Sequence, residues 1–210
     1  MPKKHCQKLK LKMNKTIFKL LAIVLVGFIG SINALANEVK PRQDTTKVRT
    51  DKNGRAYPTP PPNANRLFYL QRSANINAIS YDINLDKKTG KPDKDSPLHV
   101  YWLRYAEGNG EPSELTYLQR KFAYGFTSKS LGNDRYDIRI MSYDKFPLTL
   151  MKSVDGKYHI FAVVSKKHIL LQKIFIQIDG GSLWSPNIAY IEMKGTDPVT
   201  GKEITERFKP

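Results

Sequence analysis

Short runs of apolar and aromatic residues, separated by turn-forming residues, make up the chain from Arg66 onward. Runs bounded in this way by Gly, Pro, Asn and Asp are typical of antiparallel β-strands. The pattern predicts nine strands, over residues 66–72, 77–85, 98–105, 135–143, 146–153, 157–165, 168–178, 188–194 and 203–208. We therefore expect one all-β, mainly antiparallel domain over residues 66–210, folded as a single sandwich or barrel of about eight or nine strands.

One segment departs from the strand pattern and predicts a short inserted helix over about residues 112–124. Proline stands near its start, acidic residues lie in its first turn, and glycine follows its end. These are the usual signals of helix boundaries. Leu115, Leu118 and Phe122 recur at helical spacing, so we expect them to pack on the sheet or across a barrel end.

The first 36 residues have the layout of a secretory signal peptide. Basic residues precede an apolar run at 20–29, and Ala34-Leu35-Ala36 supplies the small residues that a cleavage site needs. We expect cleavage after Ala36 and a periplasmic or extracellular product. An uncleaved membrane anchor is the alternative, but the apolar run is shorter than the ~20 residues that span a bilayer. Met13 begins a shorter basic leader and is an alternative start of translation.

The only cysteine, Cys6, lies within this leader. The mature chain would therefore hold no disulfide, no thiolate nucleophile and no cysteine-based metal site. The predicted cleavage site also lacks the cysteine on which a lipoprotein is acylated, so we expect a product without a lipid anchor or a stable membrane span.

Residues 37–65 are rich in proline and charge and contain few large apolar residues. Such a composition cannot bury enough apolar surface to offset the entropy of ordering, so it predicts a disordered tether. The proline-rich run 58–62 would be extended, and a polyproline ligand for a partner domain is the alternative interpretation.

Positive charge is concentrated at the front of the chain. The whole sequence has 35 Lys plus Arg and 19 Asp plus Glu, a formal net charge of +16. Residues 66–210 hold 22 of the basic and 16 of the acidic residues, so the predicted β-domain carries only +6. A charge of this size is ordinary for a soluble surface, and we expect no nucleic-acid partner.

Four runs resemble a known family: Phe68–Asn77, Pro97–Tyr105, Glu114–Gly125 and Gly195–Glu206. They are similar to the family called domain of unknown function 4833, found in exported proteins of Gram-negative bacteria. The Tyr-Trp-x-Arg-Tyr run at 101–105 is their most distinctive part. The resemblance covers about residues 66–208 and implies export and a single β-rich domain, and it supplies no catalytic residue.

Motifs for catalysis or metal binding are missing from the sequence. His99, His159 and His168 show neither His-x-His nor His-Glu-x-x-His spacing, so we expect no metal and no cofactor. Gly-x-Ser-x-Gly and phosphate-binding glycine loops are also lacking. A hydrolase that uses two carboxylates has looser requirements, for which Asp137 and Glu192 are the candidates. An extracytoplasmic hydrolase is thus the alternative to a non-enzymatic binding domain.

Aromatic residues supply the candidate binding site. Ten tyrosines and two tryptophans follow residue 65, and such rings form platforms for sugars and peptides. Strand alternation places Tyr101 on one face of the run 98–105 and Trp102 with Arg104 on the other. An arginine there would emerge at a rim, find a carboxylate or meet an anionic ligand.

The predicted cleft therefore comprises Tyr101, Trp102, Arg104 and Arg120. A glycan, a lipid or an envelope protein is the expected ligand. Core tyrosines and an arginine that extends its charged end into solvent are the alternative interpretation.

Overall fold

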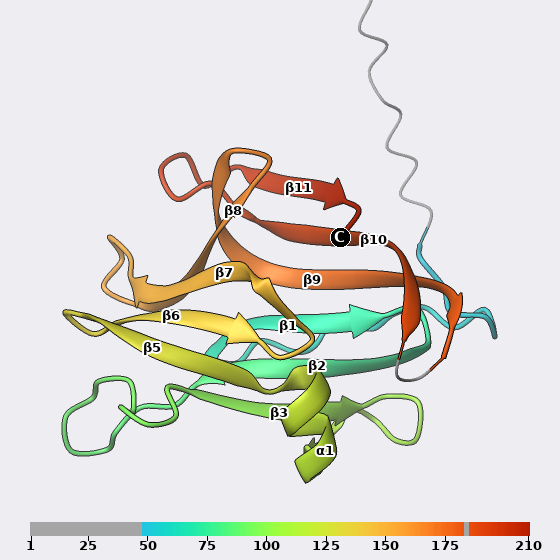
Figure 1. The fold of residues 1–210 in the computed structure, drawn as a ribbon, viewed down its shortest axis with the longest axis horizontal. Coiled ribbons are helices and arrows are strands. Elements are labelled where there is room, and N and C mark those ends of the chain that lie inside the picture. Colours follow the sequence, from blue (N-terminus) through green and yellow to red (C-terminus); the bar gives the residue numbers. More distant parts are fainter. Residues whose placement is uncertain (1–47, 183–184) are drawn as a thin grey trace, which may run out of the picture. The chain divides into compact units, whose positions relative to one another are not determined.

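A computed structural model describes residues 48–182 and 185–210 (Figure 1). The predicted signal peptide, its cleavage site and the first part of the predicted tether lie outside the described residues. The described residues form one compact unit, which holds the whole described core. No helix of the described part is long and apolar enough to cross a membrane.

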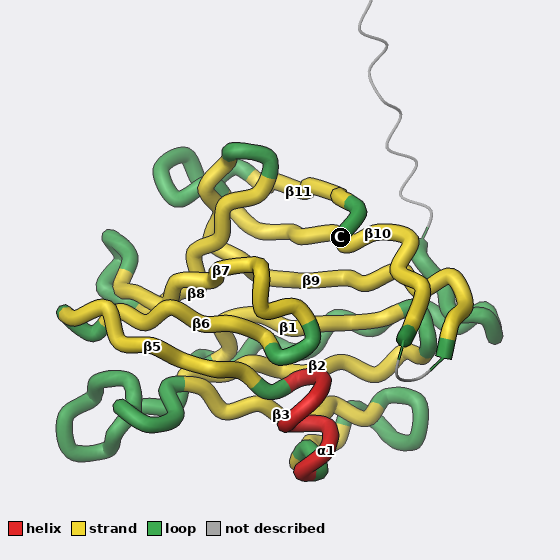
Figure 2. Tube along the Cα trace, viewed as in Figure 1, coloured by secondary structure: helices red, strands yellow, loops and turns green. Residues whose placement is uncertain are grey.

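Strands dominate this unit and form one curled sheet (Figures 1 and 2). The elements are β1 (Arg66–Arg72), β2 (Asn75–Ile83), β3 (Leu98–Arg104), β4 (Glu111–Glu114), α1 (Tyr117–Gln119), the π-helical turn η1 (Arg120–Tyr124), β5 (Phe126–Gly132), β6 (Arg135–Ile140), β7 (Tyr143–Lys152), β8 (Tyr158–Val164), β9 (Lys167–Gly181), β10 (Pro186–Thr196) and β11 (Glu203–Phe208). The strand order is β4-β3-β2-β1-β9-β8-β7-β6-β5, and β10 lies between β9 and β11. The sheet curls as a half-barrel. Because almost all described elements are strands of this sheet, the all-β prediction is confirmed.

The long strand β9 joins the two halves of the sheet. Its first residues, Lys167–Leu170, pair antiparallel with β8, and Lys173–Ile176 pair parallel with β1. Along its other edge β9 pairs with β10. The remaining pairs between described strands are antiparallel, which agrees with a mainly antiparallel fold.

The inward faces of both halves share one hydrophobic core. Strands β1 to β3 contribute residues such as Phe68 and Val100, and β6 to β8 contribute Ile138, Leu150 and Ile160, all 1% exposed or less. Alternate residues point inward because successive side chains of a strand lie on opposite faces. Burial of these side chains is the main source of stability.

The nine predicted strands correspond to β1–β3 and β6–β11, whereas β4 and β5 were not predicted. β5 has the sequence FTSKSLG and is mostly exposed. β4 has the sequence EPSE and pairs only with β3 among the described strands. Both are edge strands, which bury little apolar surface and so show little hydrophobic alternation.

The predicted helix begins later than residue 112. Pro112 lies instead in β4, at the sheet edge, where a residue without an N–H group is tolerated. Thr116 is the N-cap of α1, and its hydroxyl accepts a hydrogen bond from the backbone N–H of Gln119. The Gln119 side chain accepts in return from the Thr116 N–H at 3.0 Å. This capping box fixes the start of the helix.

The helix turns most of its predicted apolar face outward. Leu115 is 6% exposed, but Leu118 and Phe122 are each 54% exposed, so the expectation that they pack on the sheet is wrong. Leu115 precedes the N-cap, and the extended chain rather than the helix directs it inward. The helix is anchored instead at its end, where the Tyr81 hydroxyl donates to the Tyr124 carbonyl at 2.9 Å.

Residues 48–65, which we call the N-terminal strap, lie along the sheet, although the sequence predicts a disordered tether up to residue 65. Arg49 donates two hydrogen bonds of 3.0 Å to Glu192 on β10. The Gln71 side chain on β1 donates to the Pro58 carbonyl at 2.8 Å. Polar contacts of this kind leave no hydrophobic pattern, which is why composition alone predicts disorder here.

Candidate functional site

Trp102 packs against Tyr124 at the end of the helix. β3 directs it to the inward face, where it is 4% exposed. Its indole N–H donates to Gln119 Oε1 at 3.2 Å, and the ring of Tyr124 packs edge-on with centroids 5.1 Å apart. Because the capping box holds Gln119, the indole has a fixed position and orientation.

Two arginines lie over these rings. Arg104, two residues further along β3, places its guanidinium carbon 5.0 Å from the Trp102 ring centroid. Arg72, the last residue of β1, lies 5.7 Å from the Trp102 centroid and 5.0 Å from that of Tyr124. Both arginines are partly exposed. Cation–π attraction at these distances holds the two guanidinium groups beside the indole.

Neither Arg72 nor Arg104 forms an ion pair within the described ranges. Glu111 stands opposite Arg104 in the β3–β4 register, yet it makes no ion pair with it. Carboxylates do face six other arginines, namely Arg49, Arg55, Arg66, Arg120, Arg139 and Arg207. The charge of the Arg72–Arg104 pair is therefore not neutralised by a described carboxylate.

Of the four predicted site residues, Trp102 and Arg104 interact with each other and the other two point elsewhere. Tyr101 faces the opposite side of the sheet, where its hydroxyl donates to Asp82 at 2.9 Å. Arg120 lies in η1 and pairs with Glu114 at 3.1 Å. It borders an open cavity of about 400 Å³ that is also lined by residues of β5 and of the loop before β3.

Arg72 was not among the predicted residues. Phe68, Leu70 and Arg72 alternate along β1, so the strand pattern places Arg72 on the inward face. What the pattern does not show is that the Arg72 side chain reaches across β2 to the Trp102 ring on β3. That proximity comes from the order of the strands in the sheet.

A family model described as a domain of unknown function, DUF4833, matches residues 68–207. The chain belongs to this family. The match includes Arg72, Trp102 and Arg104 and confirms the resemblance seen in the sequence. Neither a curated protein nor a solved structure matches the chain significantly.

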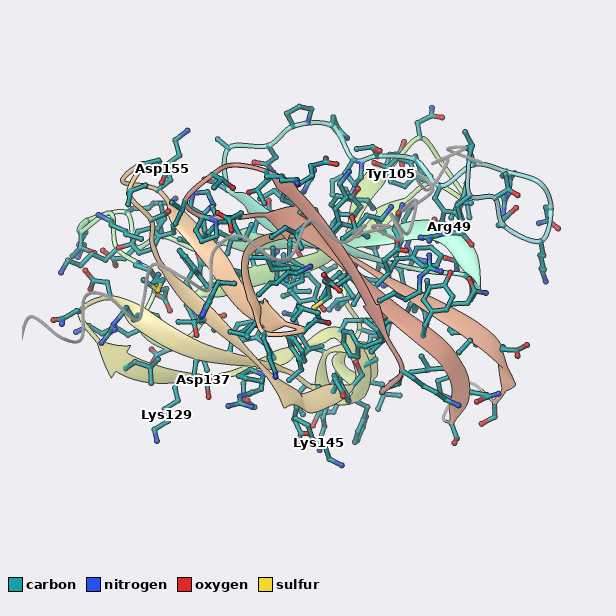
Figure 3. The ribbon with its side chains drawn as sticks, turned by 90° about the horizontal axis from the view of Figure 1, so that it is seen from above. Arg49, Tyr105, Lys129, Asp137, Lys145 and Asp155 are labelled. Atoms are coloured by element: carbon teal, nitrogen blue, oxygen red, sulfur yellow. The ribbon has the colours of Figure 1, made fainter. Side chains whose placement is uncertain are left out.

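The two carboxylates considered for hydrolysis lie apart in the DUF4833 domain. Asp137 on β6 accepts two hydrogen bonds of 3.0 Å from Arg139. Glu192 on β10 accepts from Arg49 and, at 2.7 Å, from Arg207. Three strands separate β6 from β10 in the sheet, and Figure 3 shows Asp137 and Arg49 far from each other.

Arginines determine the ionisation of Glu192. Burial alone would raise the pKa of Glu192, but hydrogen bonds and positive charge from Arg49 and Arg207 outweigh burial and lower the pKa below its usual value. Glu192 is thus ionised and neutralised by two arginines, which suits it to hold the strap on β10. This environment is the opposite of the one that prepares a general acid, whose pKa is raised.

The histidines of the DUF4833 domain are dispersed. His99 interacts with Glu114 at 2.7 Å and His159 with Asp155 at 2.9 Å. Within residues 48–182 and 185–210, no three His, Cys, Asp or Glu side chains come together as a metal site.

The interior of the half-barrel offers little room. A cavity of about 30 Å³ lies among apolar side chains that include Phe146, Ile176 and Met193. This volume accommodates one or two water molecules rather than a ligand. The arginine pair beside Trp102, at the surface, is therefore the better candidate for recognition.

Lys173 is a partly buried charge on the other face of the sheet. Its ammonium lies 5.5 Å from the ring centroid of Tyr69 and 5.8 Å from that of Phe175. Burial and the positive charge of Arg49 lower the pKa of Lys173 to about 8, although Glu192 opposes this shift.

We expect Lys173→Met to stabilise the domain at pH 7 and to remove a pH dependence above pH 8. The unfolded lysine has a pKa of about 10.5, so between pH 8 and that value the unfolded chain binds a proton that the folded chain lacks. Wild-type stability should therefore rise with pH in this window. Urea unfolding at several pH values measures it, with the exposed Lys129→Met (Figure 3) as control. A wild-type stability that is constant across this window would contradict the assignment.

Proposed function

We propose that this DUF4833 domain is an exported, non-enzymatic binding domain, and that its ligand presents an anionic group to Arg72 and Arg104 beside Trp102. The observation that carries the proposal is a pair of guanidinium groups, held over aromatic rings, for which the described chain supplies no carboxylate. The signal-peptide layout of residues 1–36 supports export to the periplasm or the cell exterior.

A phosphate or a carboxylate is the group that fits this pair. Guanidinium groups bind both through parallel, charge-assisted hydrogen bonds. The Trp102 and Tyr124 rings are themselves buried, so their part is to hold the two guanidinium groups in place for the ligand. Anionic glycans and lipids of the cell envelope carry such groups and are accessible to an exported protein.

The test is a titration of the secreted form with inorganic phosphate and with a sugar phosphate. Binding is monitored through the NMR chemical shift of the Trp102 indole N–H. Cleavage after Ala36 would give this form an N-terminus at Asn37. We expect a saturable shift in wild type and an affinity about tenfold lower in Arg72→Gln and in Arg104→Gln, because each loses a charged hydrogen-bond donor.

Arg135→Gln is the matched control, because Arg135 is exposed and its guanidinium bonds only to the Gly132 carbonyl, at 3.5 Å, within the described chain. It should bind as wild type does. If neither anion changes the chemical shift of the Trp102 indole N–H, the proposed site is wrong. It is also wrong if Arg72→Gln and Arg104→Gln bind as tightly as Arg135→Gln and wild type do.

A further inference from the structure

The helix α1–η1 presents an apolar patch to solvent. Tyr117 is 71% exposed, and Leu118 and Phe122 are each 54% exposed. Lys121 lies between the two rings, with its ammonium 5.5 Å from the Tyr117 centroid and 5.4 Å from the Phe122 centroid. Three large exposed apolar side chains within six consecutive residues form a patch of the kind that marks an interaction surface.

The turn between β6 and β7 extends this patch. The Met141 N–H donates to the Gly125 carbonyl at 2.9 Å, and the Ser142 N–H donates to the Ala123 carbonyl at 3.2 Å. Met141 is itself 38% exposed. Lys145 follows at the start of β7, and Figure 3 shows it projecting away from the domain.

The patch is held in place by the fold. The capping box fixes the first turn of the helix, and the hydrogen bond from Tyr81 fixes its last residue, Tyr124. Gly125 permits the tight exit of the chain, because a Cβ atom there would come within 2.0 Å of the Arg120 carbonyl oxygen. The apolar side chains are thus exposed on a helix that is anchored at both ends.

We propose that this helix is a membrane-docking surface, and that its partner is a bilayer that contains anionic lipids. Tyrosine, leucine and phenylalanine around a lysine are the residues that interfacial helices place at the boundary between headgroups and acyl chains. The lysine stem packs on the rings while its ammonium reaches the headgroup phosphates. The proposal goes beyond the anion site and does not require Arg72 or Arg104 to bind a free anion.

Charge supports a bilayer rather than a protein as the partner. Lys121 and Lys145 have no carboxylate partner in the described part of the chain, whereas Arg120 is paired with Glu114. Burying Lys121 inside a protein interface would require a carboxylate placed opposite it. A bilayer with anionic headgroups accepts the apolar side chains and the ammonium together, and the partly exposed Arg72, whose guanidinium lies over the Tyr124 ring, adds positive charge next to the helix.

The experiment uses residues 37–210, which contain the complete compact unit and no cysteine. An environment-sensitive fluorophore is attached at Phe122→Cys or, as control, at Val154→Cys, a position 97% exposed in the β7–β8 turn. We expect vesicles of phosphatidylcholine and phosphatidylglycerol to shift the emission at position 122 to the blue and to leave position 154 unchanged. Pure phosphatidylcholine vesicles should give a much smaller shift.

Vesicle sedimentation gives an independent measure. Leu118→Gln/Phe122→Gln should reduce partitioning onto the anionic vesicles by about tenfold or more, because two apolar side chains no longer enter the bilayer. Val154→Gln/Val199→Gln, at positions 97% and 91% exposed, should partition like wild type. All four changed side chains are exposed, so the variants should fold, which circular dichroism verifies.

The outcomes separate the two proposals. An unchanged emission at position 122 with anionic vesicles, or equal partitioning of both double variants, overturns membrane docking. A stronger response to neutral than to anionic vesicles also overturns it. Loss of the phosphate response with vesicle binding intact leaves membrane docking standing and refutes the anion site alone.

Discussion

Asp82→Ala should lower the free energy of unfolding by about 3–5 kcal/mol, since breaking a buried ionic network leaves its other members without partners. Asp82 is 6% exposed. Its carboxylate accepts hydrogen bonds from Ser80 at 2.5 Å, Asn63 at 2.7 Å and Tyr101 at 2.9 Å. Arg66 lies 3.8 Å away and is itself only 11% exposed, so its charge would lose its compensation.

Urea denaturation measures this loss, and the midpoint should fall without a change in slope. Asp137→Ala is the matched control, because its arginine partner, Arg139, is 33% exposed and the pair lies near the surface. Such a pair is worth less than about 1 kcal/mol. Equal effects of the two substitutions would show that the Asp82 network does not stabilise the fold.

Gly195→Ala should destabilise the domain by about 3 kcal/mol or more, because the added methyl group would meet backbone atoms. A Cβ atom at this position would lie 2.2 Å from the Leu170 carbonyl oxygen and 3.2 Å from the Leu171 Cα. Neither atom can rotate away as the end of a side chain could. The β9–β10 pairing shifts register between Lys194 and Gly195, so the close approach lies at an irregularity of this strand pair.

Thermal unfolding and hydrogen exchange of the β9–β10 amides test this prediction. Gly108→Ala is the control, because its Cβ atom would be 3.4 Å from the Arg104 carbonyl oxygen, an ordinary contact. Its effect should stay within about 0.5 kcal/mol. Wild-type protection of the β9–β10 amides in Gly195→Ala would show that the strand pair accommodates the methyl group, which would contradict the prediction.

The proposed anion site and the proposed docking helix share contacts. Gln119 links them, because it caps the helix with its side-chain oxygen and accepts from the Trp102 indole with the same atom. The two proposals are therefore compatible, although each has its own test.

Sequence patterns predicted most of the core and only part of the periphery. Runs that are apolar on alternate positions became β1–β3 and β6–β11, since burial of one face imposes that alternation. β5 was not predicted, because an exposed edge strand buries few side chains and therefore shows no clear alternation of apolar residues. The helix was predicted, but its start was displaced because proline and glutamate also suit the edge strand β4.

The sequence by itself determined the all-β class, the positions of nine strands and the shared face of Trp102 and Arg104, because these follow from local periodicity. Only the tertiary structure decided that Arg72 joins them, since a strand order brings together residues that no spacing along the chain relates. It also decided that Leu118 and Phe122 face solvent. Helical periodicity shows that a face is apolar, whereas the anchors at Thr116 and Tyr124 determine where that face points.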